Sequence, residues 1–417
     1  MDEKKIFVYE NWSEEPVFIG TLYVSYVRGK EQFSFEYDKQ WLSKVSTSNQ
    51  LDPDLYLYQG RQFAPLDKSQ FGIFSDSSPD RWGRMLMKRR EAIQARKEDR
   101  KPRTLQESDF ILGVYDEARM GALRFKTDRE GDFLSDDKEL ATPPWTTLRT
   151  LEAASLGFEN DESGLNEIWL KQLLAPGSSL GGARPKATVQ DENGNLWIAK
   201  FPSKHDEWNS GAWEKVVHDL AKMCELNVPE SKIKTFSETG STFLVKRFDR
   251  RGKQRIHFAS AMTLLGKVDG ASGGDGSSYL DLVTFIKSNG ASPKKDLFEL
   301  WKRIVFNMLV SNTDDHLRNH GFIYHNHGWA LSPLYDVNPI PYGNFLSLNV
   351  DMDDGLISLE LALSVAEYFD LGKKEATDAA NKMKKIVSEN WRILAVKYGL
   401  SREACERMEP AFALCNE

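Results

Sequence analysis

Residues 312–339 read NTDDHLRNHGFIYHNHGWALSPLYDVNP and are the most informative stretch of this chain. Two short apolar runs, at 322–324 and 329–331, flank a polar turn, which predicts a short β-hairpin. The outward and return rises of such a hairpin nearly cancel. The pattern therefore predicts that Asp336 lies close to Asn319 despite their separation in sequence.

The residues on either side of this hairpin are candidates for catalysis. Asp314 and Asn319 are separated by four residues, the D-x-x-x-x-N spacing with which a kinase places a base beside the substrate hydroxyl and an amide oxygen on Mg²⁺. The spacing alone is weak, because it is common by chance in solvated loops. Asp336 would add a carboxylate beside Asn319, and Mg²⁺ takes oxygen ligands. The alternative is that Asp336 caps the loop before Pro339.

Lys200 lies within a short apolar strand predicted at 196–201, in the sequence LWIAKF. A buried ammonium group without an anionic partner would be costly, so Lys200 is expected to have one. An ATP phosphate is one candidate. Glu214, on the helix predicted to follow, is another, because kinases pair a strand lysine with a helix glutamate. Glu214 could equally be a surface residue.

A glycine-rich loop, GSSLGGAR at 177–184, precedes the lysine strand. Because glycine has no Cβ, the backbone N–H groups of this loop could approach phosphates. The candidate positions are Gly181, Gly182, Ala183 and Arg184. The loop matches neither G-x-x-x-x-G-K-[ST] nor G-x-G-x-x-G, so a P-loop NTPase or a Rossmann fold has no support. An ordinary flexible turn is the alternative, and the position before the lysine strand favours phosphate binding.

Other catalytic centres have less support. His316 and His320 have the i, i+4 spacing of a metal pair, but no third ligand has a suitable spacing, and polar loop histidines are commoner than ligands. No nucleophile elbow, a G-x-S-x-G turn between a strand and a following helix, is predicted. The three cysteines share no CxxC spacing, which disfavours a zinc site and a disulfide framework. Cys224 falls on an apolar helix face and is interpreted as a core residue.

Charge and hydropathy along the chain disfavour two classes of partner, nucleic acid and membrane. The formal net charge of -7 disfavours nonspecific nucleic-acid binding by the whole chain. Residues 81–103 are strongly basic, and a solvated amphipathic helix with Trp82, Met85, Leu86 and Ile93 on its buried face is favoured over a nucleic-acid patch. The N-terminus lacks an apolar leader segment, and no run approaches the roughly 20 apolar residues that cross a bilayer. We therefore expect a cytoplasmic protein without membrane contact.

Patterning along the chain predicts three parts. The first ~75 residues alternate apolar with polar, as a small antiparallel sheet does. An acidic, Pro/Thr/Ser-rich stretch at 130–162 is a plausible boundary. A hairpin with an Asn-Gly turn, a helix, two further strands and a mostly helical remainder follow. The Asn-Gly turn is expected at 192–194. Helices are expected at 211–225, at 373–398 and from Ser401, and strands are expected at 232–236 and 242–247. The predicted boundaries are 1–160, 161–250 and 251–417.

Several motifs together resemble one known family. GSSLGGARPKA, WIAKFP, FLVKRFDR, NTDDHLRNHGF and SPLYDVNP, in this order, are similar to the HipA family of bacterial serine/threonine kinases, the toxin components of toxin–antitoxin pairs. FSFEYDKQWL, SPDRWGR and DFILGVYDEARMGALRF resemble the N-terminal subdomain of that family, so the likeness covers nearly the whole chain. It implies an α+β, two-lobed protein-kinase-like fold related to the phosphoinositide kinases, with a β-rich N-terminal subdomain and a mostly helical C-terminal lobe.

The resemblance also implies residue roles. Lys200 would contact ATP phosphates and Asp314 would be the catalytic base. Asn319 and Asp336 would bind Mg²⁺. The hinge would be 246–248, with the backbone from Lys246 to Phe248 on adenine and Asp249 near the ribose. Ser179 matches the serine that family members autophosphorylate, with Ser178 as the alternative, and a phosphate there would repel ATP or displace the loop.

By the same resemblance the substrate would be a serine of a protein, an aminoacyl-tRNA synthetase such as the glutamyl enzyme. Its phosphorylation would arrest translation and growth and would lead to persistence. The partner would be a HipB-like helix-turn-helix antitoxin, so that DNA contact would be mainly indirect. Two alternatives stay open. One is a non-catalytic, kinase-like partner of a DNA-binding repressor, and the other is a small-molecule or lipid kinase.

Overall fold

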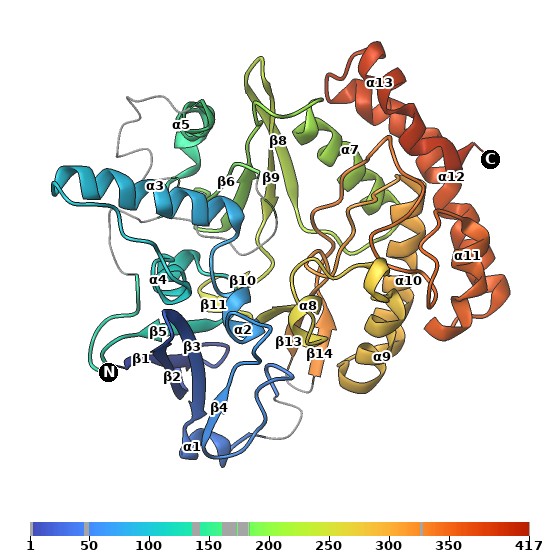
Figure 1. The fold of residues 1–417 in the computed structure, drawn as a ribbon. Coiled ribbons are helices and arrows are strands. Elements are labelled where there is room, and N and C mark those ends of the chain that lie inside the picture. The colour runs from blue at the N-terminus through green and yellow to red at the C-terminus, as the bar shows by residue number, and fades with distance from the viewer. Residues whose placement is uncertain are drawn as a thin grey trace. The chain divides into compact units, whose positions relative to one another are not determined.

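The computed structural model describes residues 3–45, 50–135, 142–160, 173, 182, 184–325 and 328–416. The chain forms two compact units (Figure 1). Unit 1 comprises Met1–Lys204 and Lys246–Ala259, and unit 2 comprises His205–Val245 and Ser260–Glu417. The three-part division at 160 and 250 stays a prediction.

Unit 1 begins with a five-stranded antiparallel sheet in the order β4-β3-β2-β1-β5. Alternate side chains of its strands form one apolar face, as in Ile6 and Val8 of β1 and Phe33 and Phe35 of β3, all at most 1% exposed. The predicted N-terminal sheet is confirmed. Its strands are β1 (Lys4–Glu10), β2 (Val17–Val27), β3 (Lys30–Tyr37), β4 (Arg61–Phe63) and β5 (Leu123–Lys126).

The longest described helix of unit 1 is α3 (Arg81–Lys97), the predicted basic helix. Asp80 caps it by accepting a hydrogen bond from Gly83 N at 2.8 Å. Trp82 and Leu86 are buried as expected, but Met85 is 41% exposed, so that part of the predicted buried face is wrong. Shorter helices of unit 1 are α1 (Lys39–Leu42), α2 (Gly72–Asp76), α4 (Glu107–Leu112), η2 (Asp116–Ala118), η4 (Trp145–Thr147) and α5 (Leu148–Glu159).

The predicted hairpin before Lys200 is confirmed. Strands β6 (Lys186–Gln190) and β7 (Leu196–Lys200) pair antiparallel, with Gln190 opposite Leu196 across the Asn-Gly turn and Lys186 opposite Lys200 at the far end. After unit 2's first segment the chain returns to unit 1 with β10 (Arg250–Arg251) and β11 (Gln254–Arg255), and β12 (Phe258–Ser260) follows.

Unit 2 contains the helix and strands predicted to follow the lysine strand. Its first segment is α7 (Ser210–Met223) and the antiparallel pair β8 (Ser231–Ser237) and β9 (Gly240–Lys246), whose last residue belongs to unit 1. The helix α12 (Lys373–Lys397) packs on α7 and on α10 (Pro293–Leu309), and Trp391 stacks on Phe412 with ring centroids 4.4 Å apart. The remaining elements are α8 (Ala261–Leu264), η5 (Gly273–Asp275), α9 (Tyr279–Asn289), β13 (Gly321–His325), β14 (Gly328–Leu331), α11 (Leu359–Ser364), η6 (Ala366–Phe369), α13 (Arg402–Met408) and η7 (Glu409–Cys415).

The described helices include none whose length and apolar character would suffice to span a bilayer. The three cysteines are free and buried. Cys224 closes α7 on its apolar side, which confirms its interpretation as a core residue.

Candidate active site

The hairpin that was expected to bring Asn319 and Asp336 together is formed within unit 2. In its register Phe322 lies opposite Leu331 and His325 opposite Gly328. Below the paired strands, Tyr335 donates its hydroxyl hydrogen to Arg318 O at 2.7 Å. The residues directly before Asp336 and Asn319 are therefore hydrogen-bonded to each other. The predicted hairpin is confirmed, and the proximity of the Asp336 and Asn319 side chains stays a prediction.

Asn319 has one polar atom that the described residues do not satisfy. Its Nδ2 donates to Asp314 O at 3.0 Å, which fixes the orientation of the amide. Its Oδ1 is buried and has no hydrogen-bond partner among the described residues. A buried acceptor is normally paired, so this oxygen is in a position to accept a hydrogen bond or to contact a cation. Amide oxygens are suitable ligands for a hard cation such as Mg²⁺.

The two flanking aspartates have environments that suit different roles. Asp314 is exposed, as a base that meets a substrate must be. Asp336 is half-buried and has a left-handed backbone with φ of 58°, which is rare and unfavourable for residues other than glycine. Such backbone strain is concentrated at functional sites. Within the described chain no three His, Cys, Asp or Glu side chains form a metal-binding group, so a metal here would rely on an amide, a carboxylate and non-protein oxygens.

Asp315, which the sequence reasoning missed, is the centre of a buried network beneath this loop. One of its oxygens, Oδ2, accepts hydrogen bonds from Tyr279 OH at 2.5 Å, Asn307 Nδ2 at 2.7 Å and His320 Nε2 at 2.8 Å. Burial favours the neutral acid, but the interaction with His320 and the hydrogen bonds outweigh it and lower the pKa of Asp315. Asn312 extends the network by donating to Asn307 Oδ1 at 3.1 Å.

This network ties the loop to two helices, since Tyr279 is the first residue of α9 and Asn307 lies near the end of α10. His320 is fully buried, and so it is not the solvated loop histidine that we expected. One sequence signal could have revealed the network. Asn307 interrupts the apolar run of α10 between Phe306 and Met308, and a polar residue on a core face needs a partner.

Lys200 and its neighbourhood belong to unit 1. Lys200 is 8% exposed and lies directly opposite Lys186, and cross-strand partners project from the same face of a sheet. Lys186 has an anionic partner, Asp80 Oδ2 at 2.8 Å, and also donates to Gly182 O at 3.3 Å. Two adjacent buried cations repel each other unless anions compensate them, and Asp80 supplies one such anion.

Glu214, the candidate partner of Lys200, is 5% exposed on α7 of unit 2, which excludes the alternative of a surface residue. Its pairing with Lys200 stays a prediction.

Four residues of the glycine-rich loop lie outside the described residues, namely Ser178, Ser179, Gly181 and Ala183. Gly182 is exposed with φ of 77°, a conformation that favours glycine, and Arg184 Nη2 donates to Phe201 O at 3.4 Å.

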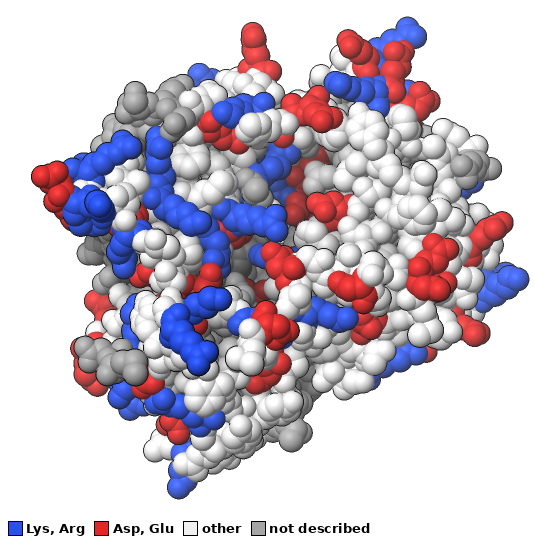
Figure 2. Space-filling model, in the orientation of Figure 1, with Lys and Arg blue, Asp and Glu red and all other residues white. Residues whose placement is uncertain are grey.

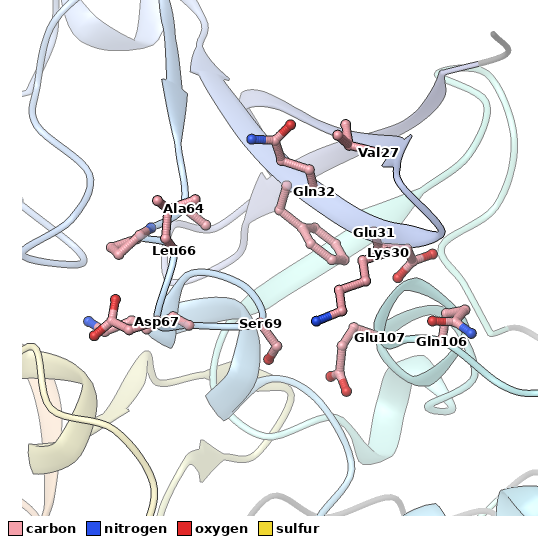
Figure 3. A pocket seen from close by; sticks show the side chains of 13 residues that line it. Val27, Lys30, Glu31, Gln32, Ala64, Leu66, Asp67, Ser69, Gln106 and Glu107 are labelled. Carbon is pink, nitrogen blue, oxygen red and sulfur yellow. The ribbon is translucent and has the colours of Figure 1, made fainter.

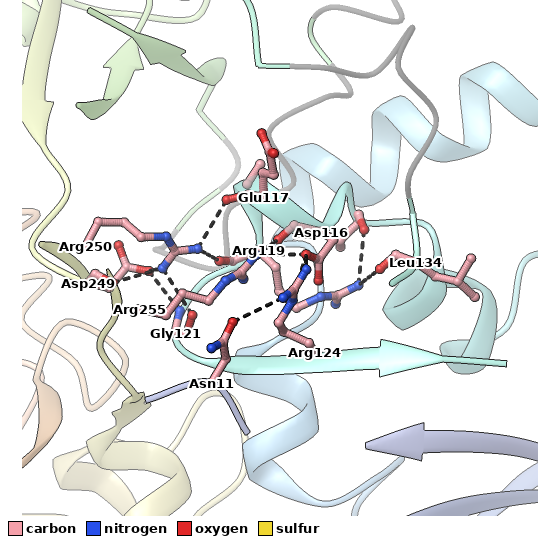
Figure 4. A network of polar contacts seen from close by, with 12 residues as sticks. Asn11, Asp116, Glu117, Arg119, Gly121, Arg124, Leu134, Asp249, Arg250 and Arg255 are labelled. Atoms are coloured by element: carbon pink, nitrogen blue, oxygen red, sulfur yellow. Dashed lines mark hydrogen bonds and ion pairs between the residues drawn. The ribbon is translucent and has the colours of Figure 1, made fainter. Parts of the chain in front are cut away.

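The predicted hinge segment is anchored inside unit 1 by a charged network (Figure 4). Arg247 N donates to Leu196 O at 2.9 Å, which places the segment beside β7. The buried carboxylate of Asp249 accepts from Arg247, from Arg250 Nη1 at 2.6 Å and from Gly121 N at 2.8 Å. A ribose contact would therefore require Asp249 to accept one more hydrogen bond. Lys246 and Phe248 are half-buried, and their roles stay predictions.

A separate hollow of about 480 Å³ in unit 1 contains none of the predicted site residues (Figure 3). Several charged side chains at its wall are already engaged. Glu107 pairs with Arg84 at 2.7 Å, Lys68 pairs with Asp54 at 2.5 Å, and Glu31 accepts from Ser108. We assign no function to this hollow.

A family model described as the HipA-like C-terminal domain matches residues 178–391, more than half of the chain, and includes Lys200, Asp314 and Asp336. The chain belongs to the HipA family. Over 200 residues it is 28% identical to a Haemophilus influenzae protein named "Putative kinase", covering 42% of this chain and 57% of the relative. It is 30% identical over 149 residues to "Putative kinase Y4mE" of Sinorhizobium fredii, covering 34% and 33%. The chain thus spans at most 57% of the length of these curated relatives.

A solved structure extends the similarity to the whole chain. The HipA chain of a Shewanella oneidensis HipA, HipB and operator DNA complex superposes with a TM-score of 0.68 at 17% identity, covering 99% of this chain and 96% of that one. At this identity the match establishes the HipA fold. The mixed α and β architecture with antiparallel sheets is therefore as expected.

Proposed function

We propose that this HipA-family chain is an ATP- and Mg²⁺-dependent serine/threonine protein kinase with a two-lobed, phosphoinositide-kinase-related fold. The observation that carries the proposal is Asn319 Oδ1, which is buried and has no hydrogen-bond partner among the described residues. The Nδ2 atom of the same amide donates to Asp314 O, and Tyr335 OH donates to the carbonyl oxygen of the neighbouring residue Arg318. The relatives named as kinases support the same conclusion.

In this proposal each residue has a distinct task. Asp314 accepts the proton of the substrate hydroxyl, as the catalytic-loop aspartate of kinases does. Asn319 and Asp336 would hold Mg²⁺, which would supply positive charge against the negative charge that develops during phosphate transfer. Lys200 binds the phosphates as a point charge, with Glu214 as its further partner. Because two oxygens come from the protein, neither alone should suffice for tight metal binding.

The remaining contacts follow from the same assignment. The backbone of Gly181 to Arg184 approaches the phosphates, and the backbone between Lys246 and Phe248 meets adenine, with Asp249 near the ribose. Ser179, or Ser178 beside it, is the autophosphorylation site. A phosphate there adds about two negative charges to a loop that must bind phosphate.

The target in this proposal is a protein serine, on an aminoacyl-tRNA synthetase such as the glutamyl enzyme, and its modification arrests translation. A HipB-like helix-turn-helix antitoxin would neutralise the kinase, and its operator would supply the DNA contact. The Shewanella HipA, HipB and operator DNA complex supports this choice of partner, because that HipA shares the fold.

Phosphate transfer from γ-labelled ATP tests the central assignment. The wild-type protein should incorporate label into itself with Mg²⁺, and Asp314→Ala should lose at least about a hundredfold in rate. Asp378→Ala, which removes an exposed aspartate of α12, is the matched control and should retain the wild-type rate. Undiminished labelling in Asp314→Ala would show that the assignment is wrong.

The metal assignment has its own test. Asn319→Ala should raise the Mg²⁺ concentration for half-maximal transfer at least about tenfold, because it removes one of two protein oxygens. Asn390→Ala on α12 removes an amide that donates to Ile386 O and should leave the Mg²⁺ dependence unchanged. Nucleotide binding without transfer would favour the non-catalytic alternative, and labelled lipid or metabolite without phosphoserine would favour a small-molecule or lipid kinase.

A further inference from the structure

Large apolar side chains are exposed on the loop that follows the candidate metal ligand Asp336. The exposed fractions are 58% for Tyr342, 59% for Phe345, 80% for Met352 and 39% for Leu356. Exposed apolar side chains that gather in one place mark interaction sites, whereas scattered ones need no explanation. The question is therefore whether these residues form one surface.

Backbone pairing shows that Phe345 and Leu356 share a face. They form an antiparallel bridge, flanked by hydrogen bonds from Leu346 N to Gly355 O and from Ile357 N to Asn344 O, both 2.8 Å. Residues directly opposite each other in an antiparallel pair project to the same side. Leu346, Leu348 and Val350 fill the core beneath, so the loop is anchored while the pair of Phe345 and Leu356 stays at the surface.

The loop also lies against the catalytic loop. Ser347 Oγ donates to Thr313 O at 2.8 Å. A Cβ atom on Gly343 would lie 3.4 Å from Thr313 Cγ2. Phe345 lies between these two contact residues in sequence, so its backbone is part of the segment that lies against Thr313, the residue before Asp314. We call residues 342–357 the acceptor platform.

The acceptor platform carries negative charge at its turn. Asp351, Asp353 and Asp354 cluster around the exposed Met352, and no Lys or Arg occurs between 342 and 357. The carboxylates of Asp351 and Asp354 accept backbone hydrogen bonds that shape the turn. The Asp353 side chain is exposed. An occupant of this surface should therefore combine apolar and basic side chains.

We propose that the acceptor platform binds the polypeptide segment that carries the phosphoacceptor, with an apolar side chain on Phe345 and Leu356 and a Lys or Arg near Asp353. This inference rests on the proposed kinase function, because it is Asp314 that fixes where the acceptor hydroxyl must lie. An extended segment advances about 3.3 Å per residue. The apolar and basic residues therefore lie on the same extended segment as the acceptor, each at a fixed number of residues from it.

A serine-centred degenerate peptide library tests the preference, with ATP and Mg²⁺ and with one flanking position fixed at a time. The wild-type protein should select an apolar residue at one position and Lys or Arg at another. Phe345→Ser with Leu356→Ser should abolish the apolar selection and raise KM for the best peptide about tenfold, with KM for ATP and kcat unchanged. Asp353→Lys should replace the basic selection with an acidic one.

Matched controls keep the outcomes separate. Ile393→Ser removes a similarly exposed apolar side chain from α12 and should leave peptide selection unchanged. Absence of transfer by the wild-type protein would contradict the proposed function itself. Transfer without flanking preference, or the same selection in the Phe345→Ser, Leu356→Ser protein, would overturn the acceptor platform alone. Sedimentation of wild type and this variant addresses a second copy of the chain as occupant, and loss of a wild-type dimer in the variant would also overturn the proposal.

Discussion

Two consecutive aspartates have opposite environments, and the difference separates chemistry from support. Asp314 is exposed, whereas Asp315 is 1% exposed and accepts three side-chain hydrogen bonds. The spacing of Asp314 to Asn319 was readable from the sequence because it is local. The partners Tyr279 and Asn307 of Asp315 come from separate helices, so no local pattern could pair them with Asp315, although the polar Asn307 in the apolar run of α10 indicates that it needs a partner.

Removal of the Asp315 carboxylate should destabilise the protein severely. Asp315→Ala leaves the buried donors of Tyr279, Asn307 and His320 unsatisfied, which should lower the free energy of unfolding by about 3–5 kcal/mol. Asp315→Asn keeps one acceptor oxygen and should cost less. Urea unfolding followed by tryptophan fluorescence measures both, with the exposed Asp378→Ala as control within about 0.5 kcal/mol. An Asp315→Ala protein as stable as this control would contradict the role of the network.

At the level of elements, sequence patterns predicted hairpins and helices better than they predicted contacts. The hairpins β6–β7 and β13–β14 both appear because short alternating runs flank polar turns. The anchoring of the β13–β14 hairpin was not predictable. Gly290 pairs with Trp329, and Ala291 N donates to Trp329 O at 2.8 Å, so the hairpin packs directly on the backbone after α9.

This close approach makes Gly328 a sensitive position. Gly328 has φ of 152°, and an added Cβ would lie 2.7 Å from Asn289 O. Gly328→Ala should therefore lower the free energy of unfolding by about 2–4 kcal/mol and disturb the return of the chain to Asp336. Urea unfolding and the rate of phosphate transfer should both report the change. Gly372→Ala, where no atom lies within 4 Å of the added Cβ, is the control, and equal stability of the two variants would contradict the packing argument.

The buried charged residues of unit 1 have partners that the sequence alone could not identify. Asp249 accepts a hydrogen bond from Gly121 N, which is 128 residues away in sequence. Arg247 and Arg250 also donate to carbonyl oxygens of residues 117–121. Hydrogen bonds and ion pairs thus connect the segment 246–251 to the loop before β5, and no local sequence pattern links the residues that make them (Figure 4).

Acid should weaken the ion pairs of Asp249 in a defined pH range. Burial alone would raise the pKa of Asp249, but Arg247 and Arg250 outweigh it and lower the pKa to about 2. A depressed carboxyl pKa stabilises the folded state above the unfolded value near 3.9, and this contribution, about 2 kcal/mol, is lost as pH falls toward 2. The stability difference between wild type and Asp249→Asn should therefore shrink between about pH 4 and pH 2 in urea unfolding. A difference independent of pH would contradict the ion-pair assignment.

The distribution of charge distinguishes the two units beyond the net value of -7. Lys and Arg side chains gather over α3 of unit 1 on the face shown in Figure 2, whereas the acceptor platform of unit 2 is acidic. Whole-chain charge could be read from composition, but this segregation required the fold. It also explains why a net acidic protein can still offer a basic surface to an acidic partner.

Nucleotide binding by the full chain should raise its thermal stability, because a ligand that binds only the folded state shifts the unfolding equilibrium. At a hundredfold excess over Kd, ATP with Mg²⁺ should contribute about 2.7 kcal/mol and a rise of several degrees in Tm. Lys200→Met and Asp336→Ala should each abolish the rise, whereas Lys253→Met, which removes an exposed lysine, should preserve it. If Lys200→Met and Lys253→Met gave the same rise, Lys200 would not bind phosphate, and the assignment of this lysine and the metal residues to one nucleotide would fail.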